Sequence, residues 1–153
     1  MQIVELQPEH IQQVRNIESV TGMTPWSEED YASAIADANP WCGWVALAEG
    51  CEQGSGLVGF SLLVLVPPES ELAKLAVHPD WQRRGIASRL FDKAIGHARA
   101  AHCQVCYLEV RSRNQGAIVF YTRHGFSICG RRKNYYRNPT DDALLMACPI
   151  LPV

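Results

Sequence analysis

The chain has 153 residues, of which 47% are hydrophobic and 20% charged, and its formal net charge is −2. This composition is typical of a globular domain with a full core. It argues against a protein that coats nucleic acid, which would be strongly basic. The N-terminus has no signal-peptide pattern, and the longest apolar stretch (57–66) is too short to span a bilayer. We therefore expect a single cytoplasmic domain over residues 1–153, with neither a membrane nor a nucleic acid as its partner.

The first half of the chain predicts a short strand, two helices and then three more strands. A strand over 2–6 precedes a helix that begins near Pro8 and carries an apolar face of Ile11, Val14, Ile17 and Val20. Ser27–Asp30 is typical of a helix cap, and the helix after it would bury Tyr31, Ala34, Ile35 and Ala38. Strands are expected over 41–49 and 57–66, around a glycine-rich turn at 50–56, and over 71–78.

The second half alternates helices and strands. Ile86, Leu90, Ala94, Ile95 and Ala98 recur at helical spacing. A strand over 104–111 follows, and Asn114 can cap a helix that ends at Gly125. Strands over 126–129 and 143–148 complete the chain. The expected fold class is a mixed α/β (α+β) domain with one layer of sheet.

Six cysteines occur in the chain. Without a signal peptide, reduced and mostly buried thiols are favoured over a disulfide framework. Cys103 and Cys106 have C-x-x-C spacing beside His102, but zinc would need at least one more ligand and no second C-x-x-C is present. We therefore expect no metal site.

The segment QRRGIA (82–87) joins a strand to a helix through two arginines and a glycine. The first N–H groups of a helix have no intrahelical partner, and the helix dipole favours an anion beside them. A phosphate or diphosphate site and a solvated basic turn both fit this segment taken alone. The pattern matches neither the P-loop nor the dinucleotide-binding motif.

The flanking sequence resembles one family. Gln82-x-x-Gly85-x-Ala87 after LAKLAVHP, together with LEVRSRNQGAIVFYTRHGF, is similar to the acetyl-CoA-binding region of the GNAT N-acetyltransferases. The stretches TPWS (24–27), LEVR (108–111), NYY (134–136) and DALLMACPI (142–150) resemble the ribosomal-protein-alanine N-acetyltransferases within that superfamily. The resemblance covers nearly the whole chain. It implies a mostly antiparallel central sheet, flanked by helices, whose strands splay apart where the pantetheine arm of acetyl-CoA inserts.

The resemblance also implies which residues bind acetyl-CoA. The backbone of three strand residues would bond to pantetheine, the loop and first helical turn would hold the pyrophosphate, and Asn114 would contact the cofactor besides capping its helix. These residues are Leu75, Ala76, Val77, Arg83, Arg84, Gly85, Ile86, Ala87 and Ser88. Ala87 stands where the family most often has glycine, and we expect this to have a modest effect on the close approach of the cofactor.

Two residues twelve apart match the catalytic spacing of the family. By resemblance Glu109 accepts the amine proton and Tyr121 protonates the departing thiolate. Glu109 could instead simply pair with Arg111 or with a charge on a neighbouring strand, and Tyr121 could pack in the core with Phe120 and Phe126. Glu71 is a rival base, since many relatives use a carboxylate on the strand before the cofactor loop.

The acceptor is expected to be a protein N-terminus, with a ribosomal protein as the implied partner. An α-amine with a pKa near 8 is about one-tenth neutral at pH 7, whereas a lysine near 10.4 is neutral in fewer than about one in a thousand molecules. A single carboxylate base therefore suits the α-amine better. The family places Trp26 and Tyr135 at the acceptor entrance, although GRRKNYYR (130–137) also fits an RNA-touching patch or a solvated turn. Acetylation of lysine or of a small amine, and acetyl-CoA binding without catalysis, are the alternatives.

Overall fold

The structure is a computed structural model that describes residues 1–37, 40–49 and 56–152. These residues form one seven-stranded sheet in the order β1-β2-β3-β4-β5-β7-β6. Every neighbouring pair is antiparallel except β4 and β5, which are parallel. The strands are β1 (Gln2–Glu5), β2 (Trp41–Leu47), β3 (Leu57–Val66), β4 (Glu69–Val77), β5 (Val105–Arg111), β6 (Ser127–Tyr136) and β7 (Asp141–Pro149). The expected mixed α/β fold with one mostly antiparallel sheet is confirmed.

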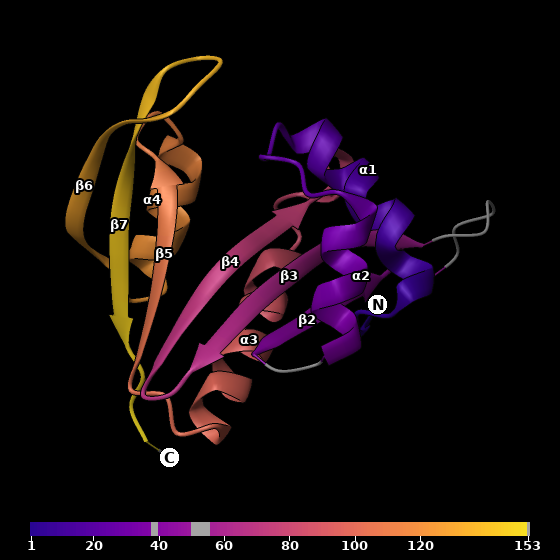
Figure 1. Cartoon of the computed structure of the whole chain (residues 1–153). Helices are drawn as coiled ribbons and strands as arrows, with labels where there is room; N and C mark the ends of the chain where they lie inside the picture. The colour runs from indigo at the N-terminus through magenta and orange to yellow at the C-terminus, as the bar shows by residue number, and fades with distance from the viewer. Residues whose placement is uncertain (38–39, 50–55, 153) are drawn as a thin grey trace.

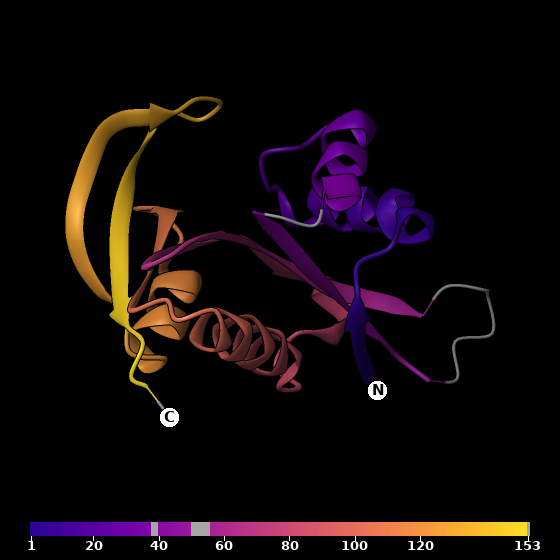
Figure 2. The same ribbon diagram turned by 60° about the horizontal axis from the view of Figure 1, so that its bottom comes forward.

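Helices cover both faces of the sheet (Figures 1 and 2). On one face lie the 3-10 turn η1 (Pro8–His10), α1 (Ile11–Thr21) and α2 (Glu28–Asp37). On the other face lie α3 (Ile86–Ala100), which follows the 3-10 turn η2 (Pro79–Trp81), and α4 (Gln115–Arg123). Two apolar cores result, one under α1 and α2 and a larger one under α3 and α4.

The parallel pair at the centre of the sheet is short. Cα partners join β4 to β5 only from Glu69–Val105 to Glu71–Tyr107, and beyond them the two strands diverge (Figure 1). A register shift against β3 leaves Ala73 as an extra residue in β4 just after this point. Such bulges bend a strand and increase its local twist. The bulge therefore accompanies the splay that the family resemblance predicted.

Val20 was expected on the buried face of the first helix, and this is wrong, because its side chain is 52% exposed. Ile11, Val14 and Ile17 are buried as expected. Val20 lies nine residues after Ile11, which is about two and a half helical turns, so it points to the opposite side. Glu18 is buried in its place.

The last two strands are longer than the sequence predicted. β6 continues through Arg131, Arg132 and Tyr136 instead of ending at Cys129, and β7 begins at Asp141. The basic, aromatic segment 130–137 is therefore mainly strand, and it pairs with β7 with a register shift between Arg132 and Tyr136. Its polar residues hid the strand because β6 is an edge strand with almost no buried side chain.

Two expected features fall at least partly outside the described residues, namely Ala38 of the second helix and most of the turn over 50–56. No helix in the described part of the chain is both long and apolar enough to cross a membrane.

Candidate active site

The splay leaves one edge of β4 unpaired on the side of β5. His78 donates its backbone N–H to the Val58 carbonyl at 2.8 Å, and the same register pairs Ala76 with Phe60. Backbone groups alternate in direction along an antiparallel strand, so those of Ala76 point to β3 whereas those of Leu75 and Val77 point into the opening. Of the three residues expected to bond pantetheine, Leu75 and Val77 thus have the required orientation.

The N-terminus of α3 lies directly after this strand and the η2 turn. Gly85 precedes the helix in a left-handed conformation, with φ of 79°. The first bond into the helix runs from Arg89 N–H to the Gly85 carbonyl, which leaves the N–H groups of Ile86, Ala87 and Ser88 without intrahelical acceptors. Three converging N–H donors and the positive end of a 15-residue helix fit a diphosphate.

The two arginines of the loop differ in their surroundings. Arg83 is exposed and has a positive φ of 62°. Arg84 donates to the Asp80 carbonyl at 3.3 Å, and its guanidinium lies 4.7 Å from the centre of the Trp81 ring. Its charge is thus held against η2, whereas the Arg83 side chain makes no such contact with any residue that the structure describes and can turn toward an anion.

Gln82 belongs to the sequence motif, and the structure shows a role for it that the motif did not predict. Its side-chain amide donates to the Val77 carbonyl at 3.0 Å. This bond occupies one of the backbone acceptors that face the opening and ties the loop to the end of β4. The signal available in the sequence was a long amide side chain five residues after Val77, the last residue of β4.

Asn114 caps α4, as its position predicted. Its side-chain oxygen accepts the Ala117 N–H at 3.2 Å. Ser27 and Asp30 cap α2 reciprocally, with the Asp30 N–H bonded to Ser27 Oγ at 3.0 Å and the Ser27 N–H bonded to Asp30 at 3.2 Å. The capping role of Asn114 is confirmed, while its contact with a cofactor stays a prediction.

Glu109 forms an ion pair with a cation that sequence reasoning did not single out. Its Oε1 lies 3.1 Å from Nε of Arg132 on β6, and the two side chains are 26% and 55% exposed respectively. The Arg132 guanidinium also lies 5.7 Å from the Tyr135 ring centre. Arg111, the one partner that the sequence named for Glu109, instead bonds the carbonyls of Pro139 and Arg137. A partly exposed pair of this kind contributes at most about 1 kcal/mol, so the Glu109 carboxylate can exchange Arg132 for another cation at little cost.

Glu71, the rival base, is close enough to Glu109 for the two carboxylates to interact. Desolvation raises the pKa of Glu71, the charge of Glu109 raises this pKa further, and Arg132 lowers it. Glu71 is also the last residue of β4 that pairs with β5. Two carboxylates and one guanidinium therefore meet where the strands begin to diverge.

Tyr121 lies on the opposite face of β5. Alternate residues of β5 are buried, and Cys106, Leu108 and Val110 belong to the core under α3 and α4, against which Tyr121 packs. The Tyr121 ring contacts Phe120 and Phe126, with centroids 5.4 and 5.6 Å away. Burial, with a smaller effect of the Cys106 thiolate, raises the pKa of Tyr121.

The aromatic packing expected of Tyr121 is therefore present, and it leaves the hydroxyl available. Among the described residues the Tyr121 hydroxyl has no hydrogen-bond partner, and it is not fully enclosed, since the buried side-chain oxygens without a partner are those of Tyr31 and Ser61. A protonated phenol without a partner can donate to a substrate atom.

The two expected acceptor-binding aromatics lie on separate segments. Trp26 precedes α2 and packs against Tyr31 and Trp41, with ring centroids 5.2 and 5.0 Å away. Tyr135 on β6 is 51% exposed. In both views the α1–α2 connection and the β6–β7 turn overhang the same face of the sheet, on the two sides of the opening (Figures 1 and 2).

The C-x-x-C cysteines are both buried. The Cys103 thiol donates to the Glu69 carbonyl at 3.2 Å, and burial raises the pKa of Cys106 to about 11. Within the described ranges, no three His, Cys, Asp or Glu side chains are clustered to hold a metal.

These features together are typical of an enzyme that transfers a group from a long anionic donor. Residues 11–126 match the model of the acetyltransferase (GNAT) family. The chain is 32% identical over 139 residues to the [ribosomal protein bS18]-alanine N-acetyltransferase of Escherichia coli K12, with 88% of each sequence covered.

Solved structures agree with this assignment. The crystal structure of the ribosomal-protein-S18-alanine N-acetyltransferase from Escherichia coli has a TM-score of 0.85 at 28% identity, covering 99% of this chain and 95% of that one. The structure of Arabidopsis thaliana NAA60 in complex with acetyl-CoA has a TM-score of 0.87 at 18% identity, covering 97% and 98% of the two chains, which shows a shared fold. The chain belongs to the acetyltransferase (GNAT) family, and its cosubstrate is acetyl-CoA.

Proposed function

We propose that the enzyme acetylates the α-amine at the N-terminus of a protein, with the N-terminal alanine of a small-subunit ribosomal protein as its acceptor. The observation that carries the proposal is the placement of Glu109 and Tyr121 on opposite faces of β5, beside the opening next to β4. The similarity to bS18-alanine N-acetyltransferases supports this acceptor.

Acetyl-CoA would extend along the free edge of β4 as an additional strand. Leu75 and Val77 would bond its pantetheine arm through their backbone, and the N–H groups of Ile86, Ala87 and Ser88 would bind its diphosphate with the help of Arg83. Arg84 and Gly85 would contribute their backbone, and Asn114 would contact the cofactor from the start of α4.

When bound, acetyl-CoA supplies a thioester carbonyl whose carbon the acceptor nitrogen attacks. Glu109 takes the proton that the nitrogen loses, either directly or through a water, and Glu71 lies close enough to share this role. Tyr121 donates its proton to the sulfur as the carbon–sulfur bond breaks, and its raised pKa keeps the phenol in the protonated form that can donate. The products are the acetylated amine and free CoA.

The acceptor would enter between Trp26 on one side and Tyr135 on the other. An N-terminal α-amine, with a pKa near 8, needs little help to lose its proton, so partly exposed carboxylates are adequate bases. A lysine amine near 10.4 would need a stronger base. The chemistry of the site thus favours N-terminal acceptors.

A panel of acceptors tests the proposal. The purified enzyme is assayed with acetyl-CoA and peptides that begin with Ala, Ser or Met, with the same peptides blocked at the N-terminus but carrying an internal Lys, and with polyamines. We expect activity with the free N-termini, highest for Ala. Activity confined to blocked Lys peptides or polyamines would refute N-terminal acetylation, and no acetyl transfer at all would favour a binding module.

A ribosomal-protein acceptor would place the reaction in the cytoplasm. We further propose that residues 1–153 act as one catalytic domain, because the donor edge, both carboxylates and both acceptor-side aromatics lie on a single sheet and its connections.

A further inference from the structure

A charged pair lies buried beneath the loop that carries Trp26. Glu18 on α1 and Lys74 on β4 are 1% and 7% exposed, and the Lys74 ammonium contacts the Glu18 carboxylate. Lys74 directly follows the bulge at Ala73, where β4 leaves β5. Burial lowers the pKa of Lys74, and the hydrogen bond and charge of Glu18 oppose this effect. The pair therefore links the strand that splays at the donor site to the helix on the acceptor side.

The same two side chains hold the backbone of the α1–α2 loop, residues 22–27. The Trp26 N–H donates to both Glu18 oxygens, at 3.3 and 3.4 Å. Lys74 Nζ donates to the Thr24 carbonyl at 2.9 Å, and Arg15 Nε donates to the Trp26 carbonyl at 3.3 Å. Charged side chains from α1 thus fix both the N–H and the carbonyl of Trp26. Lys74, a cation on the sheet, fixes the same loop at the Thr24 carbonyl.

The aromatic part of Trp26 is held by the same cation. Lys74 Nζ lies 4.9 Å from the centre of the Trp26 ring and 5.4 Å from that of Tyr31. A cation at this distance from an aromatic ring is attracted by its π face. Trp41 also packs edge-on against the Trp26 ring, with the ring centroids 5.0 Å apart. The indole therefore has one well-defined position.

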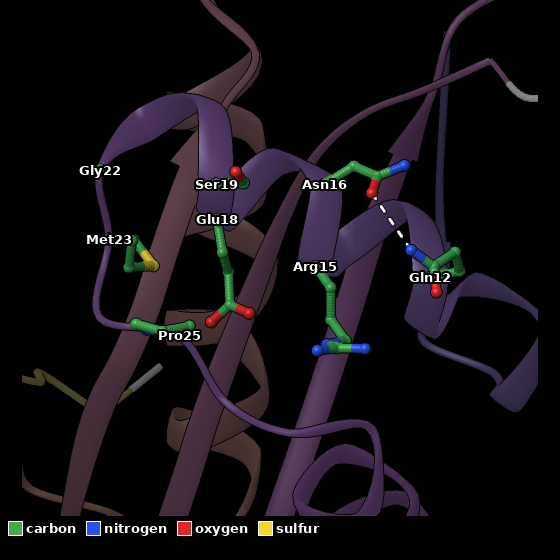
Figure 3. A pocket seen from close by; sticks show the side chains of 8 residues that line it. All are labelled: Gln12, Arg15, Asn16, Glu18, Ser19, Gly22, Met23 and Pro25. Carbon is green, nitrogen blue, oxygen red and sulfur yellow. Dashed lines mark hydrogen bonds between the residues drawn. The ribbon is translucent and has the colours of Figure 1, made fainter.

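The loop begins directly at the end of α1, where the Gly22 and Met23 N–H groups donate to the Ser19 and Glu18 carbonyls at 3.4 and 3.1 Å. A cavity of about 400 Å³ separates part of it from α1, and Figure 3 shows Glu18 extending from α1 past Met23 and Pro25 on the facing loop. Beyond Met23, the side chains of α1 that bond the loop are Glu18 and Arg15, and both bond Trp26.

Stability alone does not account for such a pair. Removing two charges from water costs several kcal/mol per ion, and replacing a buried ion pair by apolar residues of similar size is often neutral or stabilising. What apolar residues could not supply is the set of bonds to Trp26 N–H and Thr24 C=O. The pair gives the loop its position.

We infer that Glu18 and Lys74 are positioning residues that fix Trp26 at the acceptor entrance and so determine how tightly the enzyme binds its acceptor. This inference rests on the proposed function, in which Trp26 forms one side of that entrance. Neither residue touches the reacting atoms, so the pair acts on acceptor affinity and leaves the transfer step unchanged.

The test is the double variant Glu18→Leu/Lys74→Met, which removes both charges and keeps the volume. We expect a Tm within about 4 °C of wild type, since the change in free energy is expected to be small. We expect the KM for the acceptor peptide to rise about tenfold, with kcat and the KM for acetyl-CoA changed by less than about twofold. Gln12→Ala is the matched control, because it removes only the exposed bond from Gln12 to Asn16 on α1 (Figure 3).

A second variant keeps the inference testable if the double variant does not fold. Arg15→Met removes only the bond to the Trp26 carbonyl from a partly exposed side chain, and we expect the acceptor KM to rise about threefold. If the double variant folds, an unchanged acceptor KM would overturn the inference. If the double variant does not fold, an unchanged acceptor KM in Arg15→Met would overturn it. A loss confined to kcat would overturn it in either variant. All values are measured with whichever acceptor the wild-type enzyme uses best. If that acceptor is a blocked Lys peptide, the proposed function fails while the inference is still tested.

Discussion

Removing one hydroxyl from Tyr121 separates its chemical role from its packing. In Tyr121→Phe the aromatic contacts with Phe120 and Phe126, at 5.4 and 5.6 Å, are retained. The hydroxyl has no hydrogen-bond partner among the described residues, so no protein group loses a bond. The substitution therefore removes only the proposed proton donor.

The expected effect on kcat follows from the proton that the hydroxyl carries. A phenol with a pKa above its usual 10 is more than about 99% protonated at pH 8, so nearly every enzyme molecule holds the donor. General acid catalysis contributes about 10² to 10⁴ in rate. A loss of at least 10²-fold corresponds to roughly 2.7 kcal/mol of transition-state stabilisation. Folding stability should change by less than about 0.5 kcal/mol, because the hydroxyl makes no bond in the folded protein.

The assay measures kcat at saturating acetyl-CoA and acceptor peptide, together with Tm and the dissociation constant for acetyl-CoA. Tyr121→Phe should lose at least 10²-fold in kcat while the other two values stay near wild type. Thr122→Val is the control, since it removes a hydroxyl from the same helix, where Thr122 bonds the Ile118 carbonyl on the exposed side. If Tyr121→Phe retains more than about one-third of the wild-type kcat, the reasoning is refuted and the leaving thiolate obtains its proton from another source.

Three further results are expected. Glu109→Gln should lower kcat by about 10²-fold with acetyl-CoA affinity unchanged, and Glu71→Gln should lower kcat by less than tenfold. Steady-state kinetics of both variants measure these two losses. A larger loss in Glu71→Gln than in Glu109→Gln would make Glu71 the principal base. The kcat/KM for a peptide should rise with pH until the α-amine is neutral, near pH 8. It should not fall again below about pH 10, because the raised pKa of Tyr121 keeps the phenol protonated to higher pH. A fall in kcat/KM near pH 9 would contradict this role of Tyr121. Gly85→Ala should cost about 1–2 kcal/mol, because φ is 79° there, and lower Tm by roughly 2–8 °C. It should also raise the KM for acetyl-CoA and leave the KM for the peptide unchanged. Calorimetry measures the change in Tm, and kinetics with both substrates varied measure the two KM values. A rise in the KM for the peptide alone would contradict the role of this loop in acetyl-CoA binding.

The sequence predicted the elements whose buried faces are apolar at regular spacing. The strand after Gln104 and the helix after Gly85 follow this pattern, and the structure places both as expected. The pattern does not reach β6, because an edge strand buries little and so needs no alternation of apolar and polar residues. It also misplaced Val20, since a spacing of three residues rotates gradually around a helix whose true period is 3.6.

The site could be predicted only where one segment carries its residues. The loop around Gly85 and the cap at Asn114 are local, and their conformations follow from their own sequence. The partner of Glu109 could not be found in this way, because Arg132 follows it by 23 residues and reaches it across β7. The pairing of Glu18 with Lys74, 56 residues apart, likewise depends on how α1 lies over the sheet.

The long, exposed β6 strand has a consequence for the behaviour of the protein in solution. A free strand edge is a template on which another chain can add a strand and begin to aggregate. Arg131, Arg132 and Lys133 place three consecutive cations on this edge, and the irregularity that follows, with Asn134 at a φ of 53°, interrupts its regular pairing geometry. The opposite edge, β1, is only four residues long. The basic segment beside the proposed acceptor entrance is thus also expected to oppose edge-to-edge association between copies of the enzyme.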